Sequence, residues 1–451
     1  MTAVVLFTRD LRIRDNPALH AALADGERVV PLFVLDDGIL TGGFNRPNRA
    51  HFLAAALADL DASLRERGGG LVVRRGDVVE EAARVAEAVG ADVVHVAGDV
   101  SRYAVRRAER LSKRLADGGR ELEVHDDALF VVPPGRVTAA GKDHMAVFTP
   151  YHRRWLRQPR RKPFEAPRRV EVPRVPGGRG SVPSAADICA GDVSPELPEG
   201  GETPGRARMA AFLRGDAAGY AEGHDDLAGD VTSRLSPYLH FGCVSPLELV
   251  TRAAGAPDFV RQVAWRDFHA QVLAARPDAV RLDYRTRGDR WRRSAGDLAA
   301  WQAGRTGLPL VDAGMRQLLR EGWMHNRARL VVGHFLVKTL YLDWRLGARH
   351  FADLLVDGDT ANNTMNWQWV AGTGTDSRFN RTYDVTAQAR RHDPRGEYVR
   401  RYVPELAGVA GPAVHEPWKL PGGVRSALDY PDPIVVVREG NERFLRARGK
   451  R

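Results

Sequence analysis

Cysteine is almost absent from this sequence, which has only Cys189 and Cys243 among 451 residues. The two lie far apart, and neither belongs to a CxxC pair or stands beside a histidine. This scarcity argues against a disulfide framework and against a structural zinc site built on thiolates. We therefore expect no metal site.

Long apolar runs are also missing, so no segment is predicted to span a membrane. The first residues, MTAVVLFTRD, lack the apolar core and the small-residue cleavage site of a signal peptide. We expect a cytoplasmic protein of two or three domains that has no membrane partner. The net charge of +10 favours a polyanionic partner such as nucleic acid, although Arg is abundant throughout the chain.

A GxGxxG motif is absent from the first strand-to-helix turn, TRDLRIRDNPAL. Residues 4–125 alternate short apolar runs with helical patterns, which predicts a doubly wound parallel sheet of about five strands. Asn16 is expected to cap the first helix, with Pro17 at its first position. Without the glycine motif we do not assign a dinucleotide-binding module, but the carboxyl ends of such strands remain the expected ligand site.

Proline and glycine are dense between residues 126 and 205, which predicts an extended connector. Within it, FTPYHRRWLRQP is expected to form a short helix with a basic and aromatic face. Beyond residue 206 the pattern is mostly helical, and it ends in a short basic helix after Pro433.

Two of the predicted helices carry polar stripes. The helix over 258–275 places an amide, an indole, a guanidinium and an imidazole on one face, where aliphatic residues would be usual. These residues are Gln262, Trp265, Arg266 and His269. The segment EGWMHNRARLVVGHFLVKTLYLDWR is expected to place Asn326, Arg329 and Leu330 on one face, with Trp344 in its last turns. The first stripe is typical of the wall of a polar pocket, and a plain polar surface is the alternative.

The stretch DGDTANNTMNWQWVAGTGTD (357–376) combines carboxylates, amides and two tryptophans with hardly an aliphatic side chain. A surface loop rich in Asn and Gly, anchored by its tryptophans, would have this composition. A polar and aromatic ligand lying against the stretch would also account for it. Composition alone leaves both interpretations open.

Five motifs resemble, in order, the successive motifs of the photolyase and cryptochrome family: TSRLSPYLHFG (232–242), WRDF (265–268), WMHNRAR (323–329), DGDTANN (357–363) and NWQWVAGTGTD (366–376). The resemblance covers nearly the whole chain and is closest to class I cyclobutane pyrimidine dimer photolyases. The (6-4) photolyases are less similar, because their two adjacent histidines would fall at His325 and Asn326.

The resemblance implies a Rossmann-like antenna domain over residues 1–128, an interdomain connector over 129–204, and an all-helical FAD-binding and DNA-lesion domain over 205–451. It implies a monomeric carbon–carbon lyase that uses blue light and non-covalently bound FAD to repair DNA containing pyrimidine dimers. The residues that would hold FAD in such a protein are Tyr220, Thr232, Ser233, Leu235, Ser236, Arg266, Arg329, Asp357, Asp359 and Asn363.

The resemblance also divides the tryptophans by role. Trp367, Trp344 and Trp291 match a chain that carries electrons to the flavin, whereas Trp369 and Trp265 match a pair that flanks the flipped-out dimer. Asn326 and Gln262 would hydrogen-bond the dimer. The residues implied to contact the lesion strand or line its pocket are Arg327, Gln388, His224 and Leu330.

In the first domain, Arg9 and Asp99 match the antenna region of the family. The segment DVSRYA lacks the Asn-Glu pattern of folate-binding members, so a reduced 8-hydroxy-5-deazaflavin is favoured over methenyltetrahydrofolate as the second chromophore. Asp99 has an alternative role as the cap of the helix that follows it.

Several residues depart from the family pattern. Gln262 stands where class I enzymes carry Glu, Leu330 where they carry Met, His224 where they carry Arg, and Val231 where they carry Gly. Three further departures are expected at the rim of the lesion cavity: Asp384, Val385 and Ala389. The altered rim keeps a cryptochrome-like photoreceptor, or a repurposed FAD protein with weak repair, as the alternative. A plain nucleic-acid-binding protein is disfavoured, because it would need neither Asn363 nor the tryptophan chain.

Overall fold

The computed structural model describes residues 2–376 and 378–449, so residues 1, 377 and 450–451 of the expected domains lie outside it. The chain divides into two compact units. The first contains Met1–Val193, Pro198–Ala218 and Ser233–Pro277, and the second contains Ser194–Leu197, Gly219–Thr232 and Asp278–Arg451. The residues predicted to hold FAD are therefore distributed over both units.

In the described part of the chain, five parallel strands form one sheet in the first unit, in the order β3-β2-β1-β4-β5. The strands are β1 (Thr2–Phe7), β2 (Arg28–Asp36), β3 (Val72–Gly76), β4 (Val93–Ala97) and β5 (Glu121–His125). Strand β1 is central and fully buried, and it pairs with β2 and β4. The predicted parallel sheet of about five strands is confirmed.

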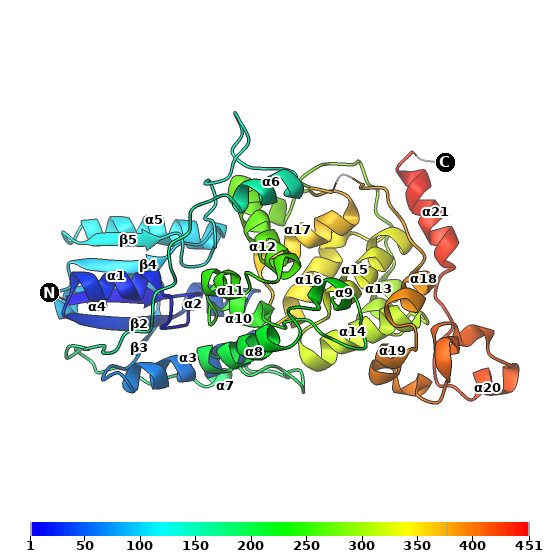
Figure 1. Ribbon diagram of the computed structural model, residues 1–451, viewed down its shortest axis with the longest axis horizontal. Coiled ribbons are helices and arrows are strands. Elements are labelled where there is room, and N and C mark those ends of the chain that lie inside the picture. Colours follow the sequence, from blue (N-terminus) through cyan, green and yellow to red (C-terminus); the bar gives the residue numbers. More distant parts are fainter. Residues whose placement is uncertain (1, 377, 450–451) are drawn as a thin grey trace. The chain divides into compact units, whose positions relative to one another are not determined.

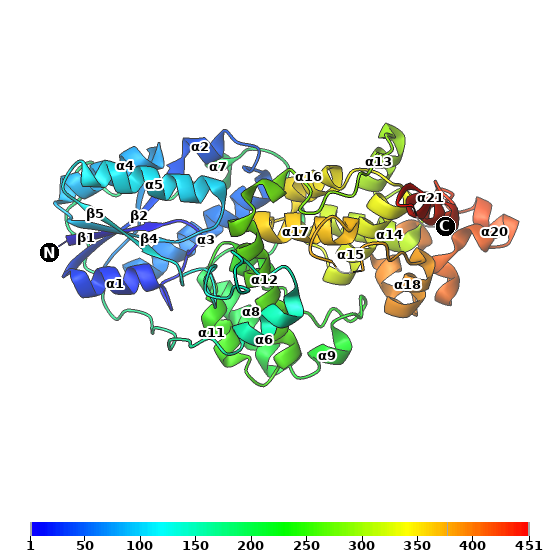
Figure 2. The same cartoon turned by 90° about the horizontal axis from the view of Figure 1, so that it is seen from above.

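The helices that connect these strands cover both faces of the sheet. They are α1 (Pro17–Asp25), α2 (Asp37–Leu40), α3 (Pro47–Arg65), α4 (Val78–Val89) and α5 (Arg102–Ala116). Figure 2 shows α4 and α5 on one face and α1 on the other, which confirms the doubly wound arrangement. The Asn16 side chain accepts from the Leu19 backbone N–H at 3.0 Å, and Pro17 starts the helix, both as predicted.

After β5 the described residues contain helices and loops but no strand, which confirms the expected order of an α/β region and a helical region (Figure 1). The later helices of the first unit are α6 (Phe148–Trp155), α7 (Ala185–Ile188), α8 (Glu202–Arg214), α10 (Ser236–His240), α11 (Pro246–Arg252) and α12 (Pro257–Ala275). The short helix predicted inside the connector is α6. Its aromatic residues Phe148, Tyr151 and Trp155 are buried, whereas Arg153 and Arg154 are exposed.

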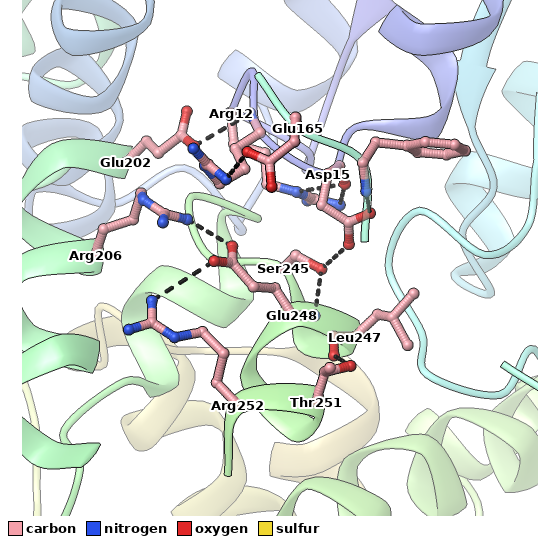
Figure 3. Close-up of polar contacts among 12 residues, drawn as sticks. Arg12, Asp15, Glu165, Glu202, Arg206, Ser245, Leu247, Glu248, Thr251 and Arg252 are labelled. Carbon is pink, nitrogen blue, oxygen red and sulfur yellow. Dashed lines mark hydrogen bonds and ion pairs between the residues drawn. The ribbon is translucent and has the colours of Figure 1, made fainter. Parts of the chain in front are cut away.

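A polar network inside the first unit joins the loop after β1 to the helices that precede α12 (Figure 3). Buried Arg12 donates to the carbonyls of Gly242 at 2.9 Å and Ala128 at 2.7 Å. Glu202 accepts from the backbone N–H of Ile13 at 2.7 Å, and the Ser245 hydroxyl donates to Asp15. These bonds satisfy buried charged groups and fix the backbone of residues 242–245.

The second unit contains α9 (Tyr220–Gly223), α13 (Ala295–Gln302), α14 (Pro309–Glu321), α15 (Asn326–His334), α16 (Trp344–Leu354), α17 (Thr360–Ala371), α18 (Val385–His392), α19 (Glu397–Tyr402), α20 (Gly422–Ser426) and α21 (Val437–Ala447). The expected basic helix after Pro433 is α21. The core of the second unit joins α14, α15, α16 and α17 in one apolar cluster. No helix within residues 2–376 and 378–449 is long and apolar enough to cross a membrane.

The predicted continuity of one helix in this unit is wrong: Trp344 does not lie in the last turns of the helix that begins at Asn326. That helix ends in a π-helical turn at 335–339, and Tyr341 then adopts a positive φ of 56°. A new helix, α16, begins at Trp344, where the Asp343 side chain accepts from the Arg345 N–H at 3.0 Å. The cap and the left-handed residue separate two helices that the apolar pattern had merged.

Candidate functional site

Helix α12 presents two of its four predicted stripe residues to solvent. Gln262 is exposed and Trp265 is half-buried. The Trp265 ring stacks on Phe148 of α6 with a centroid separation of 3.6 Å and an interplanar angle of 8°. Arg266 donates hydrogen bonds to the carbonyls of Leu129 and Leu239, so its guanidinium fixes the backbone at these two residues. The α12 surface therefore offers an accessible amide next to an indole that is held flat on one side.

Asp267 lies on the buried side of the same helix. Its Oδ2 accepts from the Trp155 indole N–H at 2.9 Å and from the backbone N–H groups of Val131 at 3.1 Å and Val132 at 2.9 Å. Burial raises the pKa of Asp267 to about 6 despite these bonds and the nearby Arg266. The carboxyl group thus anchors α12 to the loop at 131–132.

The hydroxyl-rich segment at 232–236 is divided between the units. In the first unit, the Ser233 carbonyl accepts from Arg208 Nε at 2.9 Å, and the Leu235 N–H donates to Ser233 Oγ at 3.3 Å. Ser233 and Ser236 are half-buried, whereas Leu235 is buried. In the second unit, Thr232 Oγ1 donates to Asp230 at 3.0 Å, and Tyr220 stacks on His224 with centroids 5.1 Å apart.

Arg329 and Asp357 contact each other in the second unit. Arg329 Nη2 donates to Asp357 Oδ2 at 2.8 Å, and Arg329 Nε donates to the Met324 carbonyl at 2.8 Å. Asp357 is only 7% exposed, and its second oxygen, Oδ1, is buried without a hydrogen-bond partner in the described structure. Because an unsatisfied buried carboxylate oxygen is costly, this atom marks the place for a ligand donor such as a hydroxyl or an amine.

Asp359 and Asn363 lie on the first turn of α17. The Asp359 side chain caps the helix by accepting from the Asn362 N–H at 2.8 Å. Asn363 Nδ2 donates to the Ala348 carbonyl of α16 at 2.9 Å. This bond fixes the amide plane of Asn363 and therefore the direction of its carbonyl oxygen.

The three tryptophans of the predicted electron chain share one apolar cluster in the second unit. Trp367 is 4% exposed and Trp344 is 1% exposed, whereas Trp291 is only partly buried against the cluster. Trp367 meets Trp301 and Phe351 edge-on, with centroids 6.1 Å and 5.0 Å apart. The set runs from the interior of the unit to its surface.

Each tryptophan of this set is held by a specific neighbour. Trp344 Nε1 donates to Asp283 Oδ1 at 2.9 Å, and Trp291 lies 5.1 Å from the Tyr341 ring. A Cβ on Gly347 would lie 2.2 Å from Trp367 Cη2, so only glycine leaves room for the indole there. Sequence reasoning missed both Asp283 and Gly347, because these contacts join segments that are remote in sequence.

Trp367 and Trp369 are separated by Gln368, whose side chain is fully buried. Its Nε2 donates to the carbonyls of Ala279 at 2.6 Å and Leu282 at 3.1 Å, and its Oε1 accepts from the Tyr284 N–H at 2.7 Å. Trp369 remains half-buried. Gln368 was not singled out from the sequence; the amide between two tryptophans is the signal that could have found it, although the sequence does not show what the amide binds.

The residues predicted to contact DNA differ in their surroundings. Asn326 is exposed at the first position of α15. Arg327 forms a two-point ion pair with Asp225, at 3.0 Å and 2.5 Å. His224 lines a surface cleft of about 570 Å³ together with Asp225 and Asp393. Acidic residues in this cleft make it a poor phosphate site.

The three expected rim departures do not share one environment. Asp384 is exposed and caps α18, where it accepts from the Thr386 N–H at 2.7 Å. Val385 and Ala389 are each 2% exposed and belong to the core of the second unit. The expectation that they line the lesion rim is therefore wrong: they face inward on α18. Gln388 on the same helix is half-buried, as is Leu330 on α15.

Arg9 and Asp99 form an ion pair of 3.0 Å in the first unit. Arg9 Nε also donates to the His240 carbonyl at 3.0 Å. The alternative role of Asp99 as a helix cap is wrong, because Ser101 caps α5 by accepting from the Ala104 N–H at 3.2 Å. Asp99 instead accepts from the Val100 N–H at 2.6 Å in the loop before the helix.

Comparison with known families gives two matches along the chain. Residues 3–168 match the family described as DNA photolyase, and residues 259–450 match the FAD binding domain of DNA photolyase. The first match covers the sheet, and the second begins in α12 and includes the tryptophan cluster.

Individual relatives extend these matches over nearly the whole length. The chain is 59% identical to a deoxyribodipyrimidine photo-lyase of Streptomyces griseus, over 99% of both chains. It is 35% identical to a cryptochrome DASH of Natronomonas pharaonis, over 97% of this chain and 98% of the relative. A bacterial class III photolyase from Agrobacterium tumefaciens has a similar solved structure, with a TM-score of 0.91, 31% identity, and coverage of 99% of this chain and 97% of the other.

Proposed function

Because this chain belongs to the photolyase and cryptochrome family, we propose that it is a deoxyribodipyrimidine photo-lyase that repairs cyclobutane pyrimidine dimers in DNA under blue light. The relative from Streptomyces griseus, which carries that name, supports this proposal through its 59% identity over 99% of both chains. The net charge of +10 suits a DNA substrate.

The observation that carries the proposal is a division among the tryptophans. Trp344 and Trp367 are at most 4% exposed, whereas Trp265 and Trp369 stay half-buried, as does Trp291 at the surface end of the proposed electron chain. An accessible indole is costly for a structural residue but suits the stacking of an extruded base. Trp265 is held flat by Phe148, which leaves its other face for such contact.

The residues present fit FAD, because Asp357 Oδ1 is a buried acceptor that needs a donor from outside the protein. Arg329 holds this carboxylate in place, and the Asn363 amide is fixed by Ala348. Reduced FAD, when bound, supplies the electron that opens the cyclobutane ring under blue light. The residues proposed to hold it are Tyr220, Thr232, Ser233, Leu235, Ser236, Arg266, Arg329, Asp357, Asp359 and Asn363.

The other residues position the dimer and supply electrons. Gln262 and Asn326 carry exposed amides that can donate to the carbonyls of the dimer. Trp344 and Trp367 are buried in one apolar cluster, and Trp291 packs against this cluster while remaining partly exposed. We assign them the supply of electrons from the surface of the unit.

Arg327 and Gln388 are assigned to the lesion strand, and His224 and Leu330 complete this group. Arg327 would have to exchange its ion pair with Asp225 for a phosphate, so DNA binding by this residue includes breaking that pair. The His224 Nδ1 N–H donates to the Tyr220 carbonyl at 2.8 Å, and its Nε2 lies 3.6 Å from Asp225 Oδ1, so contact of this ring with a phosphate would also mean leaving Asp225.

The proposal also covers the photolyase class, the second chromophore, the domain limits, the oligomeric state and the location of the protein. We assign the chain to class I, with a reduced 8-hydroxy-5-deazaflavin as second chromophore near the Arg9–Asp99 pair. The domain limits at residues 128 and 204, a monomeric state and a cytoplasmic location belong to the same proposal. Extraction of the chromophores from purified protein and their absorption spectra test the antenna assignment.

Repair is tested with purified, FAD-loaded protein that has been photoreduced. A duplex containing one thymine dimer is illuminated with blue light, and the restored thymines are measured by chromatography. We expect light-dependent repair and none in the dark. Protein that binds FAD and is photoreduced, yet restores no thymine, would overturn the proposal.

The second candidate is a cryptochrome-like photoreceptor with weak or no repair activity. Gln262 favours it, because a neutral amide cannot offer the dimer a proton as a carboxylic acid can. The 35% identity to a relative named cryptochrome DASH also supports this candidate. Light-dependent association with a partner protein, in the absence of repair, would support this second candidate.

A further inference from the structure

Three potential metal ligands lie together on one face of the sheet in the first unit. His95 of β4 is paired directly with Glu123 of β5, and His125 lies two residues further along β5. Because side chains at i and i+2 of a strand point to the same face, Glu123 and His125 both face His95. These residues belong to a different region of the chain from the helical FAD-binding match.

The distances between the ligand atoms suit a metal ion. His95 Nδ1 lies 3.1 Å from His125 Nε2 and 3.4 Å from Glu123 Oε2, and His125 Nε2 lies 3.8 Å from Glu123 Oε1. A tetrahedral Zn²⁺ site with bonds of 2.0 to 2.2 Å separates its ligand atoms by about 3.4 Å. The two ring nitrogens and the Glu123 carboxylate therefore lie near the spacing of such a site without rearrangement of the strands.

The second ring nitrogen of His95 is oriented toward a carboxylate. His95 is fully buried, and its Nε2 lies 3.3 Å from Asp25 Oδ2 at the end of α1. A metal-bound histidine commonly presents its other N–H to a carboxylate, which fixes the tautomer that leaves the remaining nitrogen as ligand. In the structure this approach does not meet hydrogen-bond geometry, so Asp25 would have to turn slightly toward Nε2 to hold a proton there and leave the lone pair on Nδ1.

The charge state of the rings agrees with this geometry. Burial lowers the pKa of His95, and the neighbouring His125 lowers it further; burial also lowers the pKa of His125. Neutral imidazoles are the form that binds metal. Carboxylates alone would attract Ca²⁺ or Mg²⁺, whereas two imidazoles and one carboxylate favour a transition-metal ion.

We propose that His95, Glu123 and His125 bind one divalent transition-metal ion of the Zn²⁺ type, with a water molecule in the fourth position. Strand β5 is the edge of the sheet, and its side chains are exposed or only half-buried. A metal that links β4 and β5 would hold this edge strand where apolar packing is weak. The expectation of no metal site rested on cysteines, and sequence spacing does not show that His95 and His125 meet across two strands.

Zinc binding is tested by isothermal titration of the full-length protein after treatment with a chelator. We expect one Zn²⁺ per chain for the wild type. Loss of a supporting group lowers metal affinity roughly 10- to 100-fold. His125→Ala and Glu123→Gln each remove a direct ligand, so each should lower Zn²⁺ affinity by more than this. Asp25→Asn should lower Zn²⁺ affinity about 10-fold, because Asp25 is a supporting group and not a ligand. His51→Ala, which changes an exposed histidine on α3 of the same unit, is the matched control and should bind as the wild type does.

A second measurement separates binding from folding. Zn²⁺ should raise the Tm of the wild type and of His51→Ala, and it should leave the Tm of Glu123→Gln unchanged, because Glu123 is exposed and its loss does not disturb the core. Circular dichroism checks that each variant is folded. The proposal is overturned if the wild type shows no saturable Zn²⁺ binding, or if Glu123→Gln and His125→Ala bind Zn²⁺ as tightly as the wild type.

Discussion

Helices α12 and α17 belong to different units, yet each carries a half-buried tryptophan beside a fully buried polar residue that fixes a loop. In α12 the pair is Trp265 and Asp267, and the loop is at 131–132. In α17 the pair is Trp369 and Gln368, and the loop is at 279–284. Each accessible indole is thus mounted on a helix whose position is set by buried hydrogen bonds.

The two helices differ in the chemistry of that buried residue and in what lies on their other faces. α12 uses a carboxyl group, whose charge is penalised by burial, whereas α17 uses a neutral amide. α17 also places Trp367 in the apolar cluster of the second unit, to which no residue of α12 belongs. The difference predicts that pH acts on the α12 anchor, and that core substitutions act on the electron supply of α17.

The largest expected effect separates the two faces of α17. Trp367→Phe should abolish most photoreduction of bound FAD, because phenylalanine does not relay an electron as the indole does. Repair by enzyme that was reduced chemically beforehand should be largely unchanged. Flavin absorbance during illumination measures photoreduction, and thymine recovery measures repair. An equal loss of both activities would show that Trp367 has been assigned the wrong role.

The α12 anchor should make stability depend on pH. Asp267 has a pKa of about 6 in the folded protein, raised by burial, whereas an unfolded Asp titrates near 4. The folded state therefore favours the protonated form. This contribution is complete below about pH 4 and is lost as pH rises through about 6, by about 3 kcal/mol. Asp267→Asn cannot titrate at this position. As pH rises from about 4 to about 6, its free energy of unfolding should therefore rise relative to that of the wild type by about 3 kcal/mol, as measured by urea unfolding.

Gln368 provides the matched comparison. Gln368→Leu leaves the Tyr284 N–H and two carbonyls without partners and should cost about 1 to 3 kcal/mol. Because the amide does not titrate, this cost should be the same at pH 4 and pH 7. A pH dependence as steep as that of Asp267→Asn would mean that other groups dominate and that the contrast between the anchors is incorrect.

Most of the fold could be predicted from the sequence, for identifiable reasons. The parallel sheet follows from apolar runs separated by helical patterns, and the Asn16 cap follows from local backbone chemistry. The break between α15 and α16 was missed because it depends on Tyr341 at positive φ, which apolar spacing does not reveal. Val385 and Ala389 were misplaced because position in a motif does not fix which side of α18 faces the core.

The candidate site was predictable in composition but not in its contacts. Asp357 and Arg329 were each expected to bind FAD. Their mutual ion pair and the unpartnered Asp357 Oδ1 could not be predicted from the sequence and are seen only in the structure. The same holds for Asp283 beneath Trp344 and for Gly347 against Trp367. These contacts join residues that are distant in sequence, and a single sequence carries no signal of such pairs.

A smaller effect is expected from crowding the buried face of α17. In Gly347→Ala the new Cβ would lie 2.2 Å from Trp367 Cη2 and 2.6 Å from Leu336 Cδ2, so α16 and α17 must separate. The free energy of unfolding should fall by about 2 kcal/mol. Gly296→Ala on exposed α13 meets nothing within 4 Å and should be stabilising by up to about 1 kcal/mol. Similar results for both variants, measured by urea unfolding, would contradict tight packing around Trp367.

The smallest effect tests whether Trp265 and Trp369 share a role that Trp367 does not have. Trp265→Phe keeps a ring on Phe148 but offers less surface to an extruded base, so affinity for dimer-containing DNA should fall by about 1 kcal/mol, or about fivefold in Kd. Trp369→Phe should behave similarly, and neither variant should lose photoreduction. Fluorescence titration with damaged and undamaged duplexes measures the effect. If Kd for undamaged DNA rises equally, the indoles contribute to general DNA binding and do not select the dimer.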